Sequence, residues 1–231
     1  MDLSRRSDLP EVMDDADFPA DEYHRCLTDL ARLNRLTMTH RPTLRWLDTA
    51  TRDWPRGSLI SVLDVAYGDG DLLRAIHRWA TRRHLVPVLA GIDLNPRSAE
   101  VAAAATPAGV AIAWHTGDVF AHVPPATDFI VCSQFLHHLP DSAVTDCIAW
   151  IDRHARRGWF VVDVHRHAVP YYGFRWLARV MGWHRVVRTD GTISVARGFR
   201  VAEWAALVHA AAPEAITRWV FPFRLSAGLS R

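Results

Sequence analysis

Lysine is absent from this 231-residue sequence, in which all 27 residues of the Lys and Arg class are arginine. A Schiff base to a substrate carbonyl and a phosphate-binding loop that ends in Gly-Lys-Ser/Thr both need a lysine side chain, so both are excluded. The arginines are scattered and form no dense run, which disfavours a nucleic-acid surface. We therefore expect no nucleic-acid partner.

Cysteine and long apolar segments are also scarce. The three cysteines, Cys26, Cys132 and Cys147, have no CxxC spacing, which argues against a disulfide framework or a zinc knuckle and is typical of a reducing cytoplasm. No window reaches 18 uninterrupted apolar residues, and the polar N-terminus MDLSRRSDLPEVMDDADF lacks the apolar centre of a signal peptide. The sequence predicts a cytoplasmic protein with no membrane span.

Apolar strands alternate with amphipathic helices through the middle of the chain. Strands that are apolar on both faces and separated by helices predict a parallel sheet that is covered on both sides. The five strands of this alternation are SLISVLDVA, VPVLAGID, VAIAW, DFIVCS and GWFVVDV.

The segments on either side of this alternation have other patterns. Two helices are predicted before it, at residues 20–35 and 42–51. After it, YYGFRWLARVMGW and VAEWAALVHAAA have helical spacing, DGTISVARGF is typical of a turn and a short strand, and the last residues predict an antiparallel edge. We divide the chain into an N-terminal helical cap that serves as a substrate lid, residues 1–57, and a main domain, residues 58–231, in which residues 166–202 cover the substrate.

The loop after the first strand, VLDVAYGDGDLL, indicates a ligand site, because open α/β sheets bind ligands beyond the carboxyl ends of their strands. Asp69 and Asp71 would repel a phosphate there, so a cationic ligand without phosphate fits better. S-adenosylmethionine (SAM) is such a ligand. Asp93 stands 23 residues after Gly70, close to the spacing of a ribose-binding acid, and Asp118 could bind the adenine amino group.

These motifs resemble those of class I SAM-dependent methyltransferases. The likeness covers residues 60–165 and rests on the segments VLDVAYGDGDLL, GIDLN, GDVF, FIVCSQFLHHLPD and VVDVHRH. An alanine at position 66, where many members have glycine, resembles the branch of the family that methylates quinones and secondary metabolites. The resemblance implies a Rossmann-like α/β fold with a seven-stranded, mostly parallel sheet, one antiparallel edge strand, helices on both faces, and SAM as cofactor. The cofactor-binding residues it implies are Asp64, Ala66, Tyr67, Gly68, Gly70, Asp93, Leu94, Asp118, Val119 and Ser133.

Tyr67 departs from the family pattern, which has a small residue or cysteine at this place. In one interpretation its ring packs against the cofactor, where an aromatic face stabilises a sulfonium by about 0.5–2 kcal/mol. In the other it points away and packs beneath the N-terminal helices. The sequence leaves both open.

Histidines follow the fourth and fifth strands and are candidates for the catalytic base. A phenol must lose its proton before it accepts a methyl group, and a histidine within hydrogen-bond reach can take it. We take His137, His138 and His165 as catalytic candidates, with local hydrogen bonding or capping as the alternative role. Asp163, His165 and His167 could also bind a metal, but an HxH pair alone is a weak zinc signal and we expect no metal.

Aromatic residues and arginines in the N-terminal helices and the C-terminal third are candidates for an acceptor pocket, with core packing as the alternative. These considerations predict methyl transfer to a small aromatic or polyketide-like acceptor, with a hydroxyl oxygen favoured. The alternatives are C-methylation of a quinone-like ring and a cofactor-fold binding module without activity, and a homodimer is left open. The substrate-binding candidates are Tyr23, Tyr171, Tyr172, Arg175 and Phe199.

Overall fold

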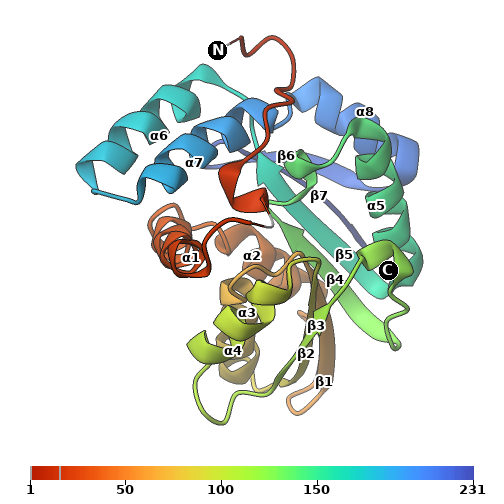
Figure 1. Cartoon of the computed structure of the whole chain (residues 1–231). Coiled ribbons are helices and arrows are strands. Elements are labelled where there is room, and N and C mark those ends of the chain that lie inside the picture. Colours follow the sequence, from red (N-terminus) through yellow and green to blue (C-terminus); the bar gives the residue numbers. More distant parts are fainter. Residues whose placement is uncertain (1, 16) are drawn as a thin grey trace.

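The computed structural model describes residues 2–15 and 17–231, and its strands form one seven-stranded sheet (Figure 1). The order is β3-β2-β1-β4-β5-β7-β6, with β1 to β5 parallel to one another and β7 antiparallel to both of its neighbours. The predicted Rossmann-like, mostly parallel sheet is confirmed, and its antiparallel strand lies in the edge hairpin, one place in from the outermost strand. The strands are β1 (Leu59–Val65), β2 (Val86–Asp93), β3 (Ile112–Thr116), β4 (Thr127–Ser133), β5 (Ala155–Val164), β6 (Ile216–Val220) and β7 (Arg224–Ser230).

Helices cover both faces of the sheet. Alternate residues of β1 enter different cores, with Leu63 and Val65 in one and Ile60 and Val62 in the other, as the two-residue period of a strand requires. The first core contains side chains from α5 and α8, and the second contains side chains from α2, α3 and α4. The α-helices are α1 (Ala20–Leu36), α2 (Arg41–Ala50), α3 (Asp71–Arg82), α4 (Pro96–Ala105), α5 (Asp141–His154), α6 (Ala168–Val180), α7 (Arg185–Arg197) and α8 (Val201–Ala211), and the short 3₁₀ turns are η1 (Val12–Asp14), η2 (Val119–Ala121) and η3 (Leu136–His138).

A third group of helices, α1, α6 and α7, lies beyond the ends of the strands. Tyr23 and Cys26 of α1, Ala178 of α6 and Val187 of α7 share one buried cluster. Figure 1 shows α6 and α7 side by side, with the N-terminal segment and η1 between them and the sheet. Residues from the N-terminal part of the chain and from the segment after β5 therefore meet above the carboxyl ends of β4 and β5.

The prediction of a turn and a short strand for DGTISVARGF is wrong, because most of that stretch lies in α7. Its β-branched residues favour a strand locally, but Ile193 and Val195 are buried in the helix. Gly191 has a packing role there, since a Cβ at this position would lie 2.3 Å from Cε1 of Phe174 on α6. Packing between two helices outweighs the local preference.

None of the helices formed by the described residues is long and apolar enough to cross a membrane.

Candidate active site

The loop between β1 and α3 is held in a conformation that favours glycine. Ala66, Gly68 and Gly70 all have positive φ, at 59°, 57° and 74°. For Ala66 this left-handed conformation costs roughly 1–2 kcal/mol. The backbone N–H of Gly68 donates to Oδ2 of Asp93 at 2.9 Å, and Oδ1 of Asp93 accepts from the N–H of Asn95 at the same distance. The structure therefore joins the glycine loop to the acid at the end of β2.

The acidic side chains of this loop have partners within the protein. Asp69 pairs with Arg74 at 2.9 Å, and Asp71 accepts a hydrogen bond from Asn34 at 3.0 Å and lies 2.9 Å from Nε2 of His40. Burial, and then the charge of Asp71, raises the pKa of Asp69 to about 6 despite its arginine partner. The negative charge of the loop is thus partly offset before any ligand binds.

Asp64 is the most deeply buried acid of this region, with 2% of its surface exposed. Burial raises the pKa of its carboxyl well above the ordinary value, and the charges of Asp71, Asp93 and Asp69 act in the same direction. Four carboxyl groups therefore crowd the carboxyl ends of β1 and β2. A cationic ligand at this edge would relieve their mutual repulsion.

Tyr67 lies in the core beneath the loop. Its ring is 4% exposed and its centroid is 4.8 Å from the ring of Trp114. It rests on Gly91 of β2, where a Cβ would come within 2.5 Å of its Cδ1, and the ring of Trp114 in turn lies against Gly70. Of the two interpretations of Tyr67, this packing agrees with the one in which the ring points away from the cofactor, and the ring rests on β2 and β3.

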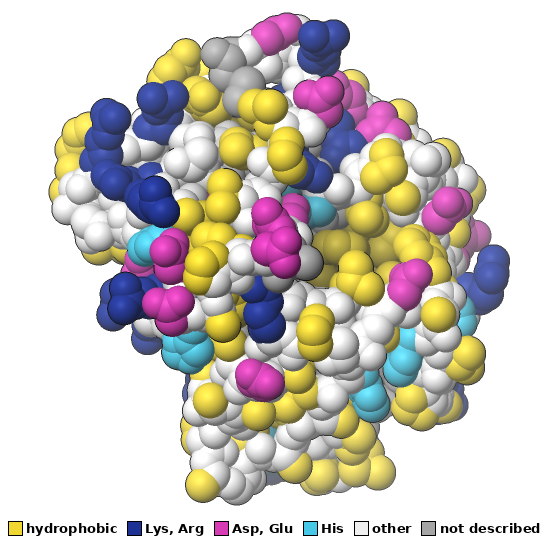
Figure 2. All heavy atoms as spheres, in the orientation of Figure 1, with side chains coloured by type: hydrophobic (Ala, Val, Ile, Leu, Met, Phe, Trp, Pro, Cys, Tyr) yellow, Lys and Arg dark blue, Asp and Glu magenta, His cyan; other side chains and the backbone are white. Residues whose placement is uncertain are grey.

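The remaining cofactor candidates differ in exposure. Leu94 is 73% exposed, whereas Val119 is buried and Oγ of Ser133, at the end of β4, is buried without a hydrogen-bond partner among the described residues. Asp118 is exposed and caps η2, because its side chain accepts from the N–H of Phe120 at 2.9 Å. Figure 2 shows that this face of the molecule is hollowed right of its centre, where hydrophobic side chains gather near acidic ones.

A cavity of about 440 Å³ lies between α1, α6, α7 and the residues that follow β4 and β5. This volume falls in the range of roughly 300–1,000 Å³ that is usual for small-molecule sites. Its wall is mostly apolar and carries a few polar groups. The apolar side chains are Met13, Leu30, Leu33, Val164, Val169, Phe174, Leu177, Val187, Val195 and Phe223, and the charged or imidazole groups are Glu11, His137, His138, Asp190 and Arg224.

His137 is held between two carboxylates at this cavity. Its Nδ1 lies 2.6 Å from Oδ1 of Asp163, and its Nε2 lies 3.6 Å from Oε1 of Glu11. Burial lowers the pKa of His137, but the charge and hydrogen bonding of Asp163, followed by Glu11, outweigh that effect and raise the pKa to about 10. A histidine that is already protonated cannot accept a proton from a substrate.

His138 is more accessible than His137, with 24% of its side chain exposed. Its ring centroid is 4.3 Å from that of His137, and its Nδ1 lies 3.0 Å from Oδ2 of Asp14. The structure thus brings two of the three catalytic candidates together at the cavity, and it ties both to acids of the N-terminal segment.

The third catalytic candidate, His165, lies elsewhere. It lines a separate hollow with Leu3, Arg166 and His167, and its Nδ1 accepts a hydrogen bond from the indole of Trp219 at 3.2 Å. Burial lowers the pKa of His165, and the nearby His167 and Arg166 lower it further. Although Asp163 and His165 are only two residues apart, Asp163 contacts His137 at the cavity and His165 does not.

None of the five substrate-binding candidates is among the described residues that line the cavity. Phe199 is fully buried against Trp204, at a ring-centroid distance of 5.1 Å. Tyr23 is buried, with its hydroxyl 3.2 Å from that of Ser98, and Tyr171 is buried in a separate small cluster. Tyr172 is 61% exposed.

The helical period explains this outcome for α6. Pro170, Gly173, Phe174 and Leu177 form the face of α6 that lines the cavity. Arg175 instead lies over the ring of Tyr171, with its Cζ 5.8 Å from the centroid. The apolar stripe of the predicted helix supplies Phe174 and Leu177 to the cavity wall, whereas Tyr172 and Arg175 lie on other faces of α6.

Arg224 is a cavity residue that the sequence analysis missed. It is 8% exposed and donates to the hydroxyls of Thr37 and Thr39 at 2.9 and 2.7 Å, while its Nε has no acceptor among the described residues. Burial lowers the pKa of its guanidinium to about 10. An arginine within the otherwise apolar strand RLSAGL is the sequence feature that could have drawn attention to it.

Comparison with known proteins identifies the central part of the chain. Residues 62–158 match the family model described as a methyltransferase domain. None of the curated proteins matches the sequence.

Solved structures of methyltransferases share the fold at low sequence identity. Magnesium protoporphyrin IX methyltransferase from Synechocystis PCC 6803, with bound SAH, is 17% identical, with 84% of this chain and 83% of that chain covered and a TM-score of 0.55. Human N-acetylserotonin methyltransferase in complex with SAM is 14% identical, covering 92% of this chain and 56% of that chain, with a TM-score of 0.63. The plantazolicin methyltransferase BpumL is 11% identical, covering 92% and 94%, with a TM-score of 0.66.

The motifs at the strand ends, the order of the sheet and the family match agree with one another. Residues 62–158 are a methyltransferase domain, and the chain shares its fold with the methyltransferases above.

Proposed function

We propose that this protein transfers the methyl group of SAM to a hydroxyl oxygen of a small aromatic or polyketide-like acceptor that binds in the 440 Å³ cavity. The position and lining of the cavity are the observation that carries this proposal. It opens beyond the carboxyl ends of β4 and β5, at the edge of the sheet where this fold binds its cofactor. Its apolar wall suits an aromatic ring, and its few polar groups can orient a hydroxyl.

Methyl transfer from a sulfonium is an in-line displacement, for which a closed site that aligns the two reactants can contribute about 7–11 kcal/mol. We assign the helical cap, residues 1–57, and the insertion, residues 166–202, to this closure. Leu30 and Leu33 of α1 line the same cavity as Phe174 of α6 and Val187 of α7. The helical cap and the insertion therefore both contribute to the cavity wall.

For the proton of the acceptor hydroxyl, we propose that His138 is the better-placed base. It lines the cavity and is partly exposed, whereas His137 is 3% exposed and paired with Asp163. In this arrangement His137 and Asp163 are positioning residues that fix η3. For SAM, we propose contacts from the glycine loop, from Asp93 to the ribose and from Asp118 to the adenine.

The test is methyl transfer from labelled SAM to a panel of hydroxylated aromatic compounds. Leu33→Trp should fill the cavity and reduce transfer to every accepted compound by at least tenfold while leaving SAM binding unchanged. Leu36→Trp makes the same change at an exposed residue of α1 that does not line the cavity, and serves as the matched control, with transfer within about twofold of wild type. Equal activity of the Leu33→Trp variant and the wild type would place the acceptor elsewhere.

Product analysis separates the favoured reaction from the alternatives. Carbon-13 spectra of the labelled product distinguish a methoxy carbon from a methyl group on a ring carbon, which would indicate C-methylation. Binding of SAM without transfer to any compound in a broad panel would favour a binding module. That alternative requires Tyr67 to obstruct the cofactor, whereas Tyr67 packs on Gly91 and Trp114.

We infer a cytoplasmic location and a role in secondary metabolism. All three cysteines are free and buried, as is usual in a reducing compartment. The likeness to a plantazolicin methyltransferase supports a metabolite acceptor, because that protein was solved in complex with a desmethyl plantazolicin analog.

A further inference from the structure

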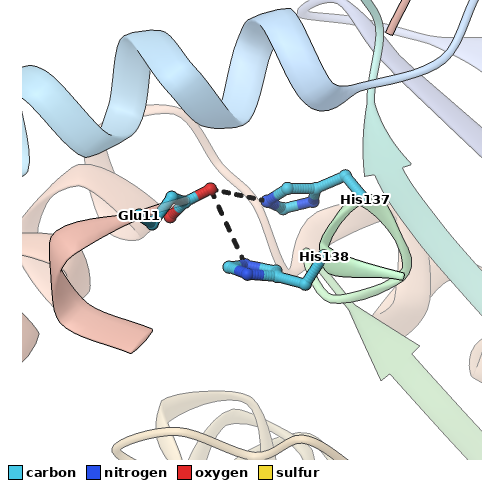
Figure 3. Close-up of side chains that lie close together, drawn as sticks. All are labelled: Glu11, His137 and His138. Atoms are coloured by element: carbon cyan, nitrogen blue, oxygen red, sulfur yellow. Dashed lines mark ion pairs between the residues drawn. The ribbon is translucent and has the colours of Figure 1, made fainter. Parts of the chain in front are cut away.

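Glu11, His137 and His138 converge at the wall of the cavity (Figure 3). Oε1 of Glu11 lies 3.6 Å from Nε2 of His137 and 3.9 Å from Nε2 of His138. The potential ligand atoms of the three residues all lie within 4.8 Å of one another. Two imidazoles from η3 and one carboxylate from the N-terminal segment thus point into the same small volume.

The spacing in this cluster is too wide for hydrogen bonds and close to that of metal ligands. At 3.6 Å the contact between His137 and Glu11 exceeds a hydrogen-bond distance, and Nε2 of His137 is buried without a partner among the described residues. An unpaired buried polar atom costs about 1–3 kcal/mol. Ligand atoms about 2.0–2.1 Å from a tetrahedral ion lie roughly 3.3–3.4 Å apart, so small movements would complete a coordination sphere.

Each histidine of the cluster has its other ring nitrogen on a carboxylate. Nδ1 of His137 lies 2.6 Å from Asp163, and Nδ1 of His138 lies 3.0 Å from Asp14. Metal-binding histidines commonly make this second contact, which fixes the ring and leaves the other nitrogen free for the metal. Both Nε2 atoms face Glu11, as such a site requires, and an ion that binds there displaces the proton that Nε2 of His137 otherwise carries.

The backbone that carries the two histidines is also fixed. Arg197 donates to the carbonyl oxygens of His137 and His138 at 3.1 and 2.7 Å, and Arg6 donates to the carbonyl of His137 at 3.0 Å. A rigid pair of ligands loses less conformational entropy when an ion binds.

We propose that Glu11, His137 and His138 bind a divalent transition-metal ion of the Zn²⁺ or Fe²⁺ class. Two imidazoles and one carboxylate are ligands that these ions accept, and three protein ligands leave a coordination position for a further oxygen ligand. Because the three residues line the cavity, that position faces the bound molecule.

The role of the ion rests on the proposed function. With the ion bound, His138 would be a ligand rather than the base, and an acceptor hydroxyl on the ion would lose its proton to solvent more readily than a free one. Its oxygen then forms a bond to the methyl carbon as the methyl–sulfur bond breaks, and the electron pair of that bond stays on sulfur. The metal site itself can be tested without any acceptor.

The test is a calorimetric titration of the full chain with Zn²⁺ alone, after dialysis against a chelator. One ion should bind per chain, with a dissociation constant in the micromolar range or below. Loss of a residue that supports a metal ligand typically weakens metal binding roughly 10–100-fold. Glu11→Gln and His138→Ala change the ligands themselves, so each should weaken Zn²⁺ binding by at least this factor. The double variant His165→Ala/His167→Ala removes a histidine pair that lies outside this cluster and should bind Zn²⁺ as the wild type does.

Zn²⁺ should also raise the melting temperature of the wild type and of the His165/His167 control, and leave that of His138→Ala unchanged. Folding of each variant is checked from its melting curve without metal. The metal site is overturned if the wild type binds no Zn²⁺ in the micromolar range, or if His138→Ala binds it equally well. A protein that methylates acceptors without binding metal would overturn this inference alone, and one that binds Zn²⁺ but methylates nothing would overturn the proposed function alone.

Discussion

The ring of Tyr67 lies directly on Gly91, and a Cβ on that glycine would meet Cδ1 of the ring at 2.5 Å and Cγ at 2.9 Å. A large side chain in the loop after β1 is therefore matched by the absence of a side chain in β2. Because Gly91 leaves room for the ring, Tyr67 can pack in the core while the backbone of its loop stays above the strand ends.

Gly91→Ala is expected to destabilise the fold by about 1–3 kcal/mol, because the new methyl group overpacks the core against Tyr67. Tyr67→Cys alone should also destabilise it, since it leaves a cavity. The double variant should be more stable than the sum of the two effects predicts, by at least about 1 kcal/mol. Urea unfolding of the four proteins measures this coupling, and strict additivity would refute the contact.

Ala66→Gly is expected to leave the stability unchanged or raise it by up to about 1.6 kcal/mol. The variant relieves the left-handed strain of roughly 1–2 kcal/mol, and it loses about 0.4–1 kcal/mol because glycine makes the unfolded chain more flexible. Ala75→Gly, in the middle of α3, is the control and should destabilise the protein by roughly 0.5–1 kcal/mol. Equal destabilisation by both changes in thermal melts would show that Ala66 carries no strain.

Asp69 should make the folded protein less stable as the pH rises. Its pKa in the folded state is about 6, above the ordinary 3.8, so the folded protein holds this proton more tightly than the unfolded chain does. The stabilisation of the folded state by this tightly held proton is fully present below about pH 4, and it is lost as the pH rises to about 6. The Asn of an Asp69→Asn variant cannot titrate.

The stability of Asp69→Asn relative to wild type should therefore increase by about 1–3 kcal/mol between pH 4 and neutral pH. Urea unfolding at several pH values measures the difference. A difference that is constant with pH, or one that falls, would contradict the raised pKa of Asp69.

Arg224 is a buried cation at the proposed acceptor cavity, with no carboxylate in salt-bridge range among the described residues. An acceptor that carries a carboxylate should therefore bind better than its neutral amide. In thermal-shift titrations, salicylate should bind the wild type at least tenfold more tightly than salicylamide, and Arg224→Met should lose this preference. The variant should be as stable as the wild type or more so, since replacing a buried charge with an apolar group is often neutral or stabilising. An unchanged preference would place the anion elsewhere.

The sheet and the glycine loop could be predicted because their signals are local. Strands that are apolar on both faces, a glycine turn and an acid after β2 each reside in a few consecutive residues. The cavity could not be predicted in this way, because Glu11, His137 and Arg224 are far apart in the sequence and meet only when the N-terminal segment and β7 fold onto the ends of β4 and β5.

Packing overrides a local pattern in one segment and separates two neighbouring residues in another. The β-branched residues of DGTISVARGF indicate a strand, yet the close approach of Phe174 to Gly191 belongs to a pair of helices. Asp163 and His165 are two residues apart on β5 and its end, yet Asp163 contacts His137 whereas His165 accepts a hydrogen bond from Trp219.

Calorimetric binding of SAM by the wild type and by Asp93→Asn tests the central claim most directly. The account predicts one SAM per chain. It also predicts that the variant binds SAM roughly tenfold to a hundredfold more weakly, which is the equivalent of one charged hydrogen bond of about 1.5–3 kcal/mol. The melting temperature of the free variant is the control for folding. No heat with SAM, or tighter binding of ATP than of SAM, would contradict it.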